Sequence, residues 1–246
     1  MEKLYSRQAV RECLRAKRRV IRRLHMGEGV EDAPIIRDIR ALAQQQRIPI
    51  SNANRDFLAS ISRETQGVAL EVDDYPYADL DDIYAAAAAR NEPAFILVLD
   101  SLQDPHNVGS LIRTADAAGV HGVVMGERRS AGVTPAVVNA SSGAAEHMLV
   151  AQVVNVARAI DEMKARETWV AALAGEAKQS IYQCDLRGAL AIIVGSEGEG
   201  VHKLLRDKAD FLLRLPMHGK VESLNASVAG AVALYEAVRQ RTKTAD

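Results

Sequence analysis

The sequence predicts an α/β protein in which a small N-terminal α/β domain precedes a larger domain built on a parallel sheet. In the larger part, continuously apolar runs alternate with helical segments, which is typical of parallel strands covered by helices on both faces. These runs are Phe95–Leu99, Val120–Met125, Trp169–Leu173, Leu190–Val194 and Phe211–Leu215. An acidic, proline-containing stretch at residues 73–82 separates them from the front of the chain. We therefore expect a first domain at 1–72, a linker and leading helix at 73–93, and a second domain at 94–246.

The front domain reads as a compact α/β unit whose first half is ambiguous. The apolar side chains of Ser6–Leu24 fall near helical spacing, which predicts one long helix with a basic face. A helix ending near Lys17, followed by a strand at Arg19–Met26 that stops at Gly27, fits the same residues equally well. Periodicity leaves both alternatives open. The remaining expected elements are a helix at Pro34–Gln46 and strands at Ile48–Ser51 and Val68–Val72.

Charge is spread unevenly along the chain. The net charge is −1, yet residues 1–25 hold nine basic side chains against two acidic ones, a local charge of +7. A polyanion such as RNA would meet this end of the chain first. The alternative is that the basic run forms the solvated face of a helix. Residues 1–25 are therefore a candidate RNA-binding surface.

Composition limits the classes of function. The chain is 48% hydrophobic, but no run approaches the roughly 18 apolar residues of a membrane span, and no apolar signal segment follows Met1. We expect a cytoplasmic protein without membrane contact. Cys13 and Cys184 belong to no C-x-x-C or Cys/His cluster, so we expect neither a disulfide nor a metal site. Both are interpreted as small buried hydrophobic residues.

Ligands of parallel sheets bind at the carboxyl ends of the strands, which makes three loops candidate sites. The first loop, at 104–113, follows the first apolar run and contains the proline and glycine of a turn. Asn107 can cap the helix that runs to about Ala118, and Arg113 lies further into that helix. Read alone, Asn107 is only a cap and Arg113 only a surface residue.

The second loop, Gly195-Ser196-Glu197-Gly198-Glu199-Gly200, stands between a strand and a helix. Its glycines follow G-x-x-G-x-G instead of the dinucleotide-binding G-x-G-x-x-G, and its two glutamates would repel a pyrophosphate. A cationic ligand is tolerated better, and S-adenosylmethionine carries a cationic sulfonium. A nicotinamide-dependent oxidoreductase is therefore the weaker interpretation of this loop.

The third loop, at 215–225, ends the last apolar run and precedes a helix at Asn225–Arg241. Read alone, Ser223 and Asn225 are helix-capping residues. The apolar side of the helix suits an intramolecular core and a subunit contact equally well. Three polar, turn-rich strand ends in one sheet favour a shared site over three separate caps.

Together the three loops resemble the motifs of a known family. The matching segments are DPHNVGSLIRTADAAG at 104–119, IVGSEGEGV at 193–201 and LPMHGKVESLNASVAGAVALYEAVRQR at 215–241. In this order they are similar to the motifs of the SpoU (TrmH) branch of the SPOUT RNA methyltransferases. Within that branch the chain looks most like the RlmB-like 23S rRNA guanosine 2′-O-methyltransferases. The resemblance covers nearly the whole chain and is strong from Phe95 onward.

The resemblance implies a fold, a cofactor and a site. The implied fold is a ribosomal-protein-like substrate-binding domain followed by a SPOUT domain, whose parallel sheet contains a C-terminal trefoil knot, in a homodimer without a metal. The implied cofactor is S-adenosylmethionine. The residues implied to line this methyl donor are Gly195, Leu215 and Leu224. The residues implied at the target ribose and its phosphate are Asn107, Arg113, Glu197, Ser223 and Asn225.

The implied activity is methyl transfer from S-adenosylmethionine to a ribose 2′-hydroxyl in RNA, with a guanosine of 23S rRNA as the first expectation. A guanidinium is a poor proton acceptor, so we expect Arg113 to anchor the target phosphate and to stabilise the developing alkoxide. The alternative within the superfamily is a tRNA ribose methyltransferase, which would not require a separate front domain. A more distant alternative is a non-catalytic RNA-binding protein.

Overall fold

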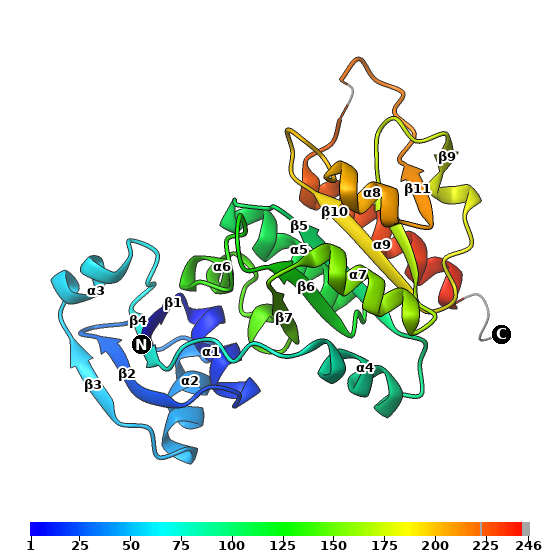
Figure 1. Cartoon of the computed structure of the whole chain (residues 1–246). Coiled ribbons are helices and arrows are strands. Elements are labelled where there is room, and N and C mark those ends of the chain that lie inside the picture. Colours follow the sequence, from blue (N-terminus) through cyan, green and yellow to red (C-terminus); the bar gives the residue numbers. More distant parts are fainter. Residues whose placement is uncertain (222, 243–246) are drawn as a thin grey trace. The chain divides into compact units, whose positions relative to one another are not determined.

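The computed structural model describes residues 1–221 and 223–242, which form two compact units (Figure 1). Unit 1 combines residues 1–76 with residues 133–147. Unit 2 combines residues 77–132 with the described residues from 148 onward. The sequence predicts one boundary near residues 73–80, and it gives no sign of the second segment of unit 1.

Unit 1 contains a four-stranded sheet with the strand order β1-β4-β2-β3. Its ambiguous first half forms α1 (Arg7–Ala16) and β2 (Ile21–Gly27), so the alternative of a helix followed by a strand is the observed one. Lys17 ends α1 in the left-handed conformation, with φ at 54°. The other elements are β1 (Glu2–Tyr5), α2 (Pro34–Gln45), β3 (Ile50–Ala53), α3 (Arg55–Ile61), β4 (Val68–Val72), α6 (Pro135–Ala140) and the 3-10 helix η1 (Ala144–Glu146).

The core of unit 1 follows from the register of its strands. Leu4, Leu24 and Leu70 lie opposite one another on one face of the sheet and are fully buried. Helix α1 packs on β1 and β4 and is itself packed against α2. On the opposite face, a smaller apolar cluster forms between α3 and the sheet around Leu58 and Ala69. Alternating side chains thus give each face of the sheet its own apolar contact.

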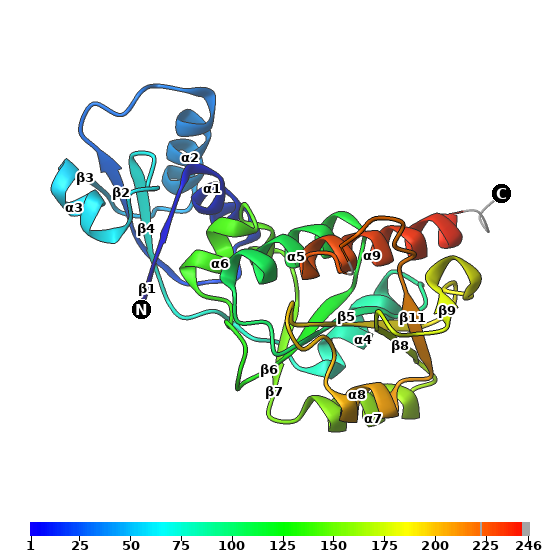
Figure 2. The same cartoon turned by 90° about the horizontal axis from the view of Figure 1, so that it is seen from above.

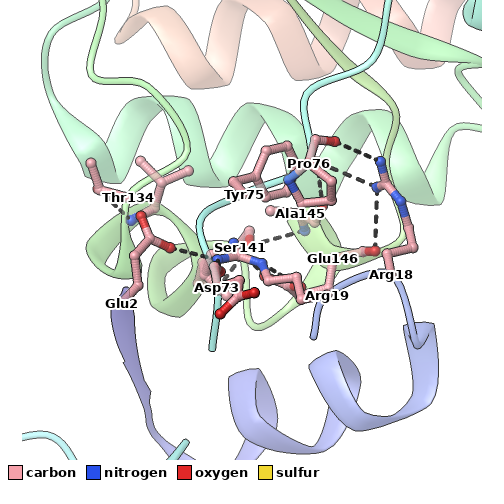
Figure 3. A network of polar contacts seen from close by, with 12 residues as sticks. Glu2, Arg18, Arg19, Asp73, Tyr75, Pro76, Thr134, Ser141, Ala145 and Glu146 are labelled. Carbon is pink, nitrogen blue, oxygen red and sulfur yellow. Dashed lines mark hydrogen bonds and ion pairs between the residues drawn. The ribbon is translucent and has the colours of Figure 1, made fainter. Parts of the chain in front are cut away.

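Residues 133–147 are joined to the rest of unit 1 by a buried polar network (Figure 3). The Arg19 guanidinium lies 2.8 Å from Glu146 Oε1, and the two side chains are 0% and 1% exposed. The Tyr75 hydroxyl donates to the Ala145 carbonyl oxygen at 2.8 Å. Arg18 donates to the carbonyl oxygens of Glu146 and Pro76. The fold of unit 1 therefore depends on a segment that is distant from it in sequence.

Unit 2 is built on a seven-stranded sheet in which neighbouring strands are parallel, as predicted. The strand order is β7-β6-β5-β10-β8-β11-β9. The strands are β5 (Phe95–Asp100), β6 (Gly122–Gly126), β7 (Val150–Val153), β8 (Trp169–Leu173), β9 (Gln179–Ser180), β10 (Leu190–Gly195) and β11 (Phe211–Arg214). The order reverses between β5 and β10. In sheets of this kind ligands bind beyond the carboxyl ends of the strands at such a reversal.

Helices cover both faces of the sheet in unit 2 (Figure 2). They are α4 (Leu80–Ala89), α5 (Pro105–Ala117), α7 (Val156–Ala165), α8 (Lys203–Lys208), α9 (Ala226–Thr242) and the 3-10 helix η2 (Ile181–Gln183). Ile96 and Val98 of β5 join a buried cluster with α4, α7 and α8, while α9 packs on α5 and β10. Gly230 permits this approach, because a Cβ atom there would lie 2.4 Å from Leu111 Cδ2.

The structure can be compared with two expectations drawn from composition, one about the cysteines and one about membrane spans. Cys13 and Cys184 are both buried, as predicted, and burial raises the pKa of the Cys13 thiol. In the part of the chain that the structure describes, none of the helices has the length and apolar character needed to cross a bilayer.

Candidate active site

The loop after β5 brings Asn107 to the carboxyl end of the sheet. Asp104 is the cap of α5, because its Oδ1 accepts the backbone N–H of His106 at 3.0 Å. The prediction that Asn107 caps this helix is therefore wrong. Asn107 lies inside the first turn, is 6% exposed, and uses its side chain for other contacts. Pro105 begins the helix, where its missing N–H costs no intrahelical hydrogen bond.

Three of the five predicted target residues form one hydrogen-bonded cluster. Asn107 Nδ2 donates to Asp104 Oδ2 at 3.1 Å and to Glu197 Oε1 at 3.2 Å. Asn225 Nδ2 donates to Asn107 Oδ1 at 2.9 Å and also to Glu197 Oε1. The three side chains come from the loops after β5, β10 and β11. We call Asn107, Glu197 and Asn225 the amide–carboxylate cluster.

Asn225 has a second, structural role. Its Oδ1 accepts the backbone N–H groups of Ser227 at 2.9 Å and Val228 at 3.2 Å, at the start of α9. One oxygen thus caps the helix while the amide nitrogen serves the cluster. The predicted cap is therefore confirmed, and the same side chain also belongs to the cluster.

An apolar cavity opens beside the cluster. Its walls include the side chains of Leu173, Val194, Leu213, Leu215, Met217 and Leu224. Gly195, Leu215 and Leu224, the residues predicted for the methyl donor, all line it, and so does Ser223. Gly195 fits only as glycine, since a Cβ atom there would lie 2.1 Å from the backbone carbon of Gly200. The backbones of Gly195 and Gly200 therefore lie close together, and both residues line the cavity.

A polar cavity of about 500 Å³ adjoins the apolar one. Ser196 and Glu197 line both cavities, and Asn107 lines the polar one. The carboxylate of Glu197 therefore borders a largely apolar space on one side and a polar space on the other. A negative charge at such a boundary favours a cationic group bound in the apolar cavity.

Arg113 is placed differently from the other predicted target residues. It lies in α5, six residues after Asn107, and its side chain is exposed. Neither cavity is lined by Arg113. The structure thus gathers the amide–carboxylate cluster, sets Ser223 on the wall of the apolar cavity, and leaves Arg113 outside both.

Asp100 and His202 were missed by the sequence prediction. Asp100 ends β5, is 5% exposed, and accepts the backbone N–H of His202 at 2.7 Å. Its carboxylate also lies 2.9 Å from His202 Nδ1. These contacts hold the loop after β10 to the end of β5. The signal in the sequence was an aspartate closing a continuously apolar strand, because a charged side chain there needs a polar partner.

The basic run at residues 1–25 is mostly engaged inside unit 1. Arg19 is buried in the network with Glu146, Arg22 pairs with Asp73, and Arg15 pairs with Asp38. Much of the local charge of +7 is therefore neutralised by carboxylates elsewhere in the unit.

Sequence profiles of two families match this chain. The SpoU rRNA methylase family matches residues 94–235. A profile described as RNA 2′-O ribose methyltransferase substrate binding matches residues 4–78. The two profiles together span most of the chain, and the substrate-binding profile precedes the methylase profile.

Individual relatives agree with these profiles. YacO of Bacillus subtilis (strain 168), described as a TrmH family tRNA/rRNA methyltransferase, is 44% identical over 234 residues, covering 95% of this chain and 93% of YacO. RlmB of Pseudomonas putida, a 23S rRNA (guanosine-2′-O-)-methyltransferase, is 40% identical over 242 residues, covering 98% of this chain and 97% of RlmB. The SpoU methyltransferase AviRb from Streptomyces viridochromogenes, solved in complex with AdoMet, has the same fold, with a TM-score of 0.83 at 24% identity over 98% of this chain and 90% of AviRb.

Proposed function

This chain belongs to the SpoU rRNA methylase family and is an S-adenosylmethionine-dependent RNA 2′-O-ribose methyltransferase, and we propose that its target is a guanosine of 23S rRNA. The relatives named RlmB, which are aligned over nearly their whole length, support this target. The observation that carries the proposal is the amide–carboxylate cluster at the boundary of the two cavities. Neither an oxidoreductase nor a non-catalytic RNA-binding protein accounts for that arrangement.

The methyl donor fits the apolar cavity. Leu215 and Leu224 offer apolar walls for an adenosine, and the packed backbone at Gly195 brings main-chain groups to the cavity. Glu197 provides a negative charge at the rim, which suits a sulfonium. Bound there, S-adenosylmethionine supplies a methyl group on a positively charged sulfur.

The acceptor hydroxyl is proposed to lie at the amide–carboxylate cluster. Glu197 Oε1 accepts the amide groups of Asn107 and Asn225, whereas Oε2 accepts no hydrogen bond from residues 1–221 and 223–242. We propose that Oε2 accepts the ribose 2′-hydroxyl, while the two amides fix the carboxylate, with Ser223 on the wall of the donor cavity. The proton of the hydroxyl passes to the solvent, directly or through one intervening water.

Arg113 is proposed to hold the target phosphate and to stabilise the developing alkoxide. Its guanidinium stays protonated, so it acts as a fixed positive charge with several donors and not as a base. Its exposed place on α5 is accessible to an extended RNA strand.

Four further parts of the proposal concern the whole protein. Unit 1 is proposed to bind the RNA substrate, supported by the profile that matches residues 4–78. Two copies are proposed to form a homodimer through α9, where Val228 and Tyr235 are exposed. The segment from β10 to α9 is proposed to follow the knotted path that the family resemblance implies, and the enzyme is proposed to act in the cytoplasm.

Methyl transfer to two RNAs tests the target. Radiolabelled S-adenosylmethionine is incubated with fragments of 23S rRNA and, separately, with tRNA, and labelled nucleosides are identified after digestion. We expect 2′-O-methylguanosine from the 23S rRNA fragments alone. Transfer to tRNA alone would replace the proposed target by the second candidate, which the tRNA/rRNA description of the Bacillus relative favours. Transfer to neither RNA would contradict the proposed function.

A further inference from the structure

The polar cavity adjoins the donor cavity at Ser196 and Glu197, which line both. Its lining combines the cluster residues Asn107 and Glu197 with Gln103, Arg129, Glu199 and His202. Its volume of about 500 Å³ lies within the range of small-molecule sites, roughly 300–1,000 Å³. A nucleotide whose ribose lies at the cluster has its base attached at one edge of the same ring. The polar cavity is the adjoining space in which that base can lie.

We propose that the polar cavity holds the base of the acceptor nucleotide and that Glu199 selects guanine there. This inference rests on the proposed function. Guanine presents two adjacent donors, N1–H and the 2-amino group, and a carboxylate accepts such a pair with both of its oxygens. Adenine presents an acceptor at N1 and has no 2-amino group, so the same carboxylate disfavours it.

Two of the three carboxylates that line this cavity are already engaged. Asp104 caps α5 and accepts the amide of Asn107. Glu197 accepts two amides within the cluster. Glu199 is 79% exposed, and in the described chain its one basic neighbour is His202, whose Nε2 lies 3.5 Å away. Because the second oxygen of Glu197 is assigned to the ribose 2′-hydroxyl, Glu199 is the carboxylate with both oxygens available to a bound base.

His202 keeps Glu199 at the cavity. The imidazole is fixed on its other side by Asp100, whose buried carboxylate accepts the His202 backbone N–H and lies 2.9 Å from Nδ1. The ring thus faces Asp100 through Nδ1 and Glu199 through Nε2. A buried anchor thus positions an exposed carboxylate, which reduces the conformational freedom that Glu199 loses when a base binds.

The remaining lining suits the other edge of guanine. Arg129 brings a guanidinium to the cavity, and Gln103 brings an amide. Arginine is the usual partner of guanine O6 and N7 in nucleic-acid complexes. The cavity therefore offers donors for the acceptor edge of guanine and one carboxylate for its donor edge.

Base substitution in the acceptor nucleotide tests the inference. Three RNA fragments that differ only in the target base carry guanosine, inosine or adenosine, and kcat/KM for methyl transfer is measured with the wild type and with Glu199→Ala. Inosine lacks the 2-amino group. We expect the wild type to prefer guanosine over inosine by about 10- to 100-fold, the value of one hydrogen bond to a charged acceptor. In Glu199→Ala this preference should fall to about onefold, because the acceptor is gone.

Two controls separate the possible results. Glu162→Ala removes an exposed carboxylate that lines neither cavity and should keep the wild-type preference. Calorimetry should give equal donor affinity for all three proteins. An unchanged preference in Glu199→Ala would overturn the inference and leave the proposed function intact. A wild type that methylates none of the three RNAs would overturn the proposed function and this inference with it.

Discussion

At the scale of single residues, the two oxygens of Glu197 differ in their contacts and, in the proposed mechanism, in their tasks. One oxygen is saturated by the amides of Asn107 and Asn225, which fixes the direction of the other. Such fixed groups lower the free energy of a transition state because they need no reorientation during the reaction. The cavity proposed for the donor, in contrast, is built mostly from apolar side chains and backbone. Catalysis and donor binding should therefore respond to different substitutions.

Glu197→Ala and Asn107→Ala test this separation. We expect kcat for RNA methylation to fall about 100- to 1,000-fold in each variant, as for the loss of one preorganised polar group. The dissociation constant for S-adenosylmethionine, measured by calorimetry, should stay close to that of the wild type. Lost donor affinity with a normal rate at saturating donor would instead assign these residues to the donor site.

His121 makes the stability of unit 2 dependent on pH. Its side chain is 1% exposed, Nδ1 accepts the backbone N–H of Phe95 at 3.0 Å, and Nε2 lies 3.1 Å from Glu92. Burial, reinforced by the charge of Arg90, lowers the pKa of His121. In the unfolded chain the pKa is near 6.5. The unfolded state therefore binds the proton more readily, so acid favours unfolding.

The free energy of unfolding should accordingly be constant at neutral pH and fall as the pH drops below about 6.5. In His121→Gln, whose side-chain oxygen can accept the same backbone N–H, the fall should be smaller. Urea titrations of both proteins between about pH 7.5 and pH 5.5 measure the difference. Identical pH slopes would show that His121 does not contribute.

At the scale of secondary-structure elements, the residue that caps α9, Asn225, is also proposed to serve the reaction. Asn225→Asp separates the two roles, because an aspartate keeps the oxygen that caps α9 but loses both donors to the cluster. We expect wild-type thermal stability and a loss of methyl transfer of about 100-fold or more. Asn225→Ala should lose the transfer and, in addition, about 1 kcal/mol of stability. Full activity in Asn225→Asp would limit this residue to capping.

The elements differ in how far the sequence could predict them. The five apolar runs became strands because helices on both faces of the sheet bury most of their side chains, and a continuous apolar run can be recognised without a structure. β2 was ambiguous because its pairing with β4 is irregular between Ile21 and Arg23, which interrupts the alternation expected of a strand. β1 escaped prediction because four residues are too few to display a period.

The candidate site was predicted in its residues and less well in its contacts. The family resemblance implies Asn107, Glu197 and Asn225 as site residues, and the structure joins them in one cluster, yet the predicted cap of α5, Asn107, is replaced by Asp104. Either side chain can cap a helix, and only the backbone at the start of α5 decides between them. The pairing of Asp100 with His202 joins residues 102 positions apart, a relation that no local pattern records.

At the scale of the whole molecule, unit 1 depends on the ion pair between Arg19 and Glu146. Removing one partner leaves the other buried and unpaired, so Arg19→Met should lower the free energy of unfolding by about 3–5 kcal/mol. The double variant Arg19→Met/Glu146→Met should recover much of this loss, because no buried charge remains. Arg22→Met, which breaks an exposed pair with Asp73, is the matched control and should leave stability nearly unchanged. Urea unfolding followed by circular dichroism measures all three.

Equal losses in Arg19→Met and Arg22→Met would show that burial does not govern these contacts.

The buried ion pair also affects any test of RNA binding that removes the N-terminal segment of unit 1. Deleting residues 1–72 removes Arg19 and leaves Glu146 without its cation, so a loss of activity would combine lost RNA contacts with a damaged fold. Substitution of exposed basic residues such as Lys3 and Arg23 examines RNA binding without that complication.

The two-segment construction of unit 1 also has a consequence during translation. Residues 1–76 leave the ribosome before residues 133–147 have been made, so the nascent chain emerges with Arg19 lacking its carboxylate. N-terminal domains commonly fold first as the chain is synthesised. Unit 1 cannot complete its fold at that stage, because residues 133–147 follow β5 and β6 of unit 2 in the sequence. We expect nascent chains halted before residue 133 to be digested readily by protease, and chains released past residue 147 to resist it.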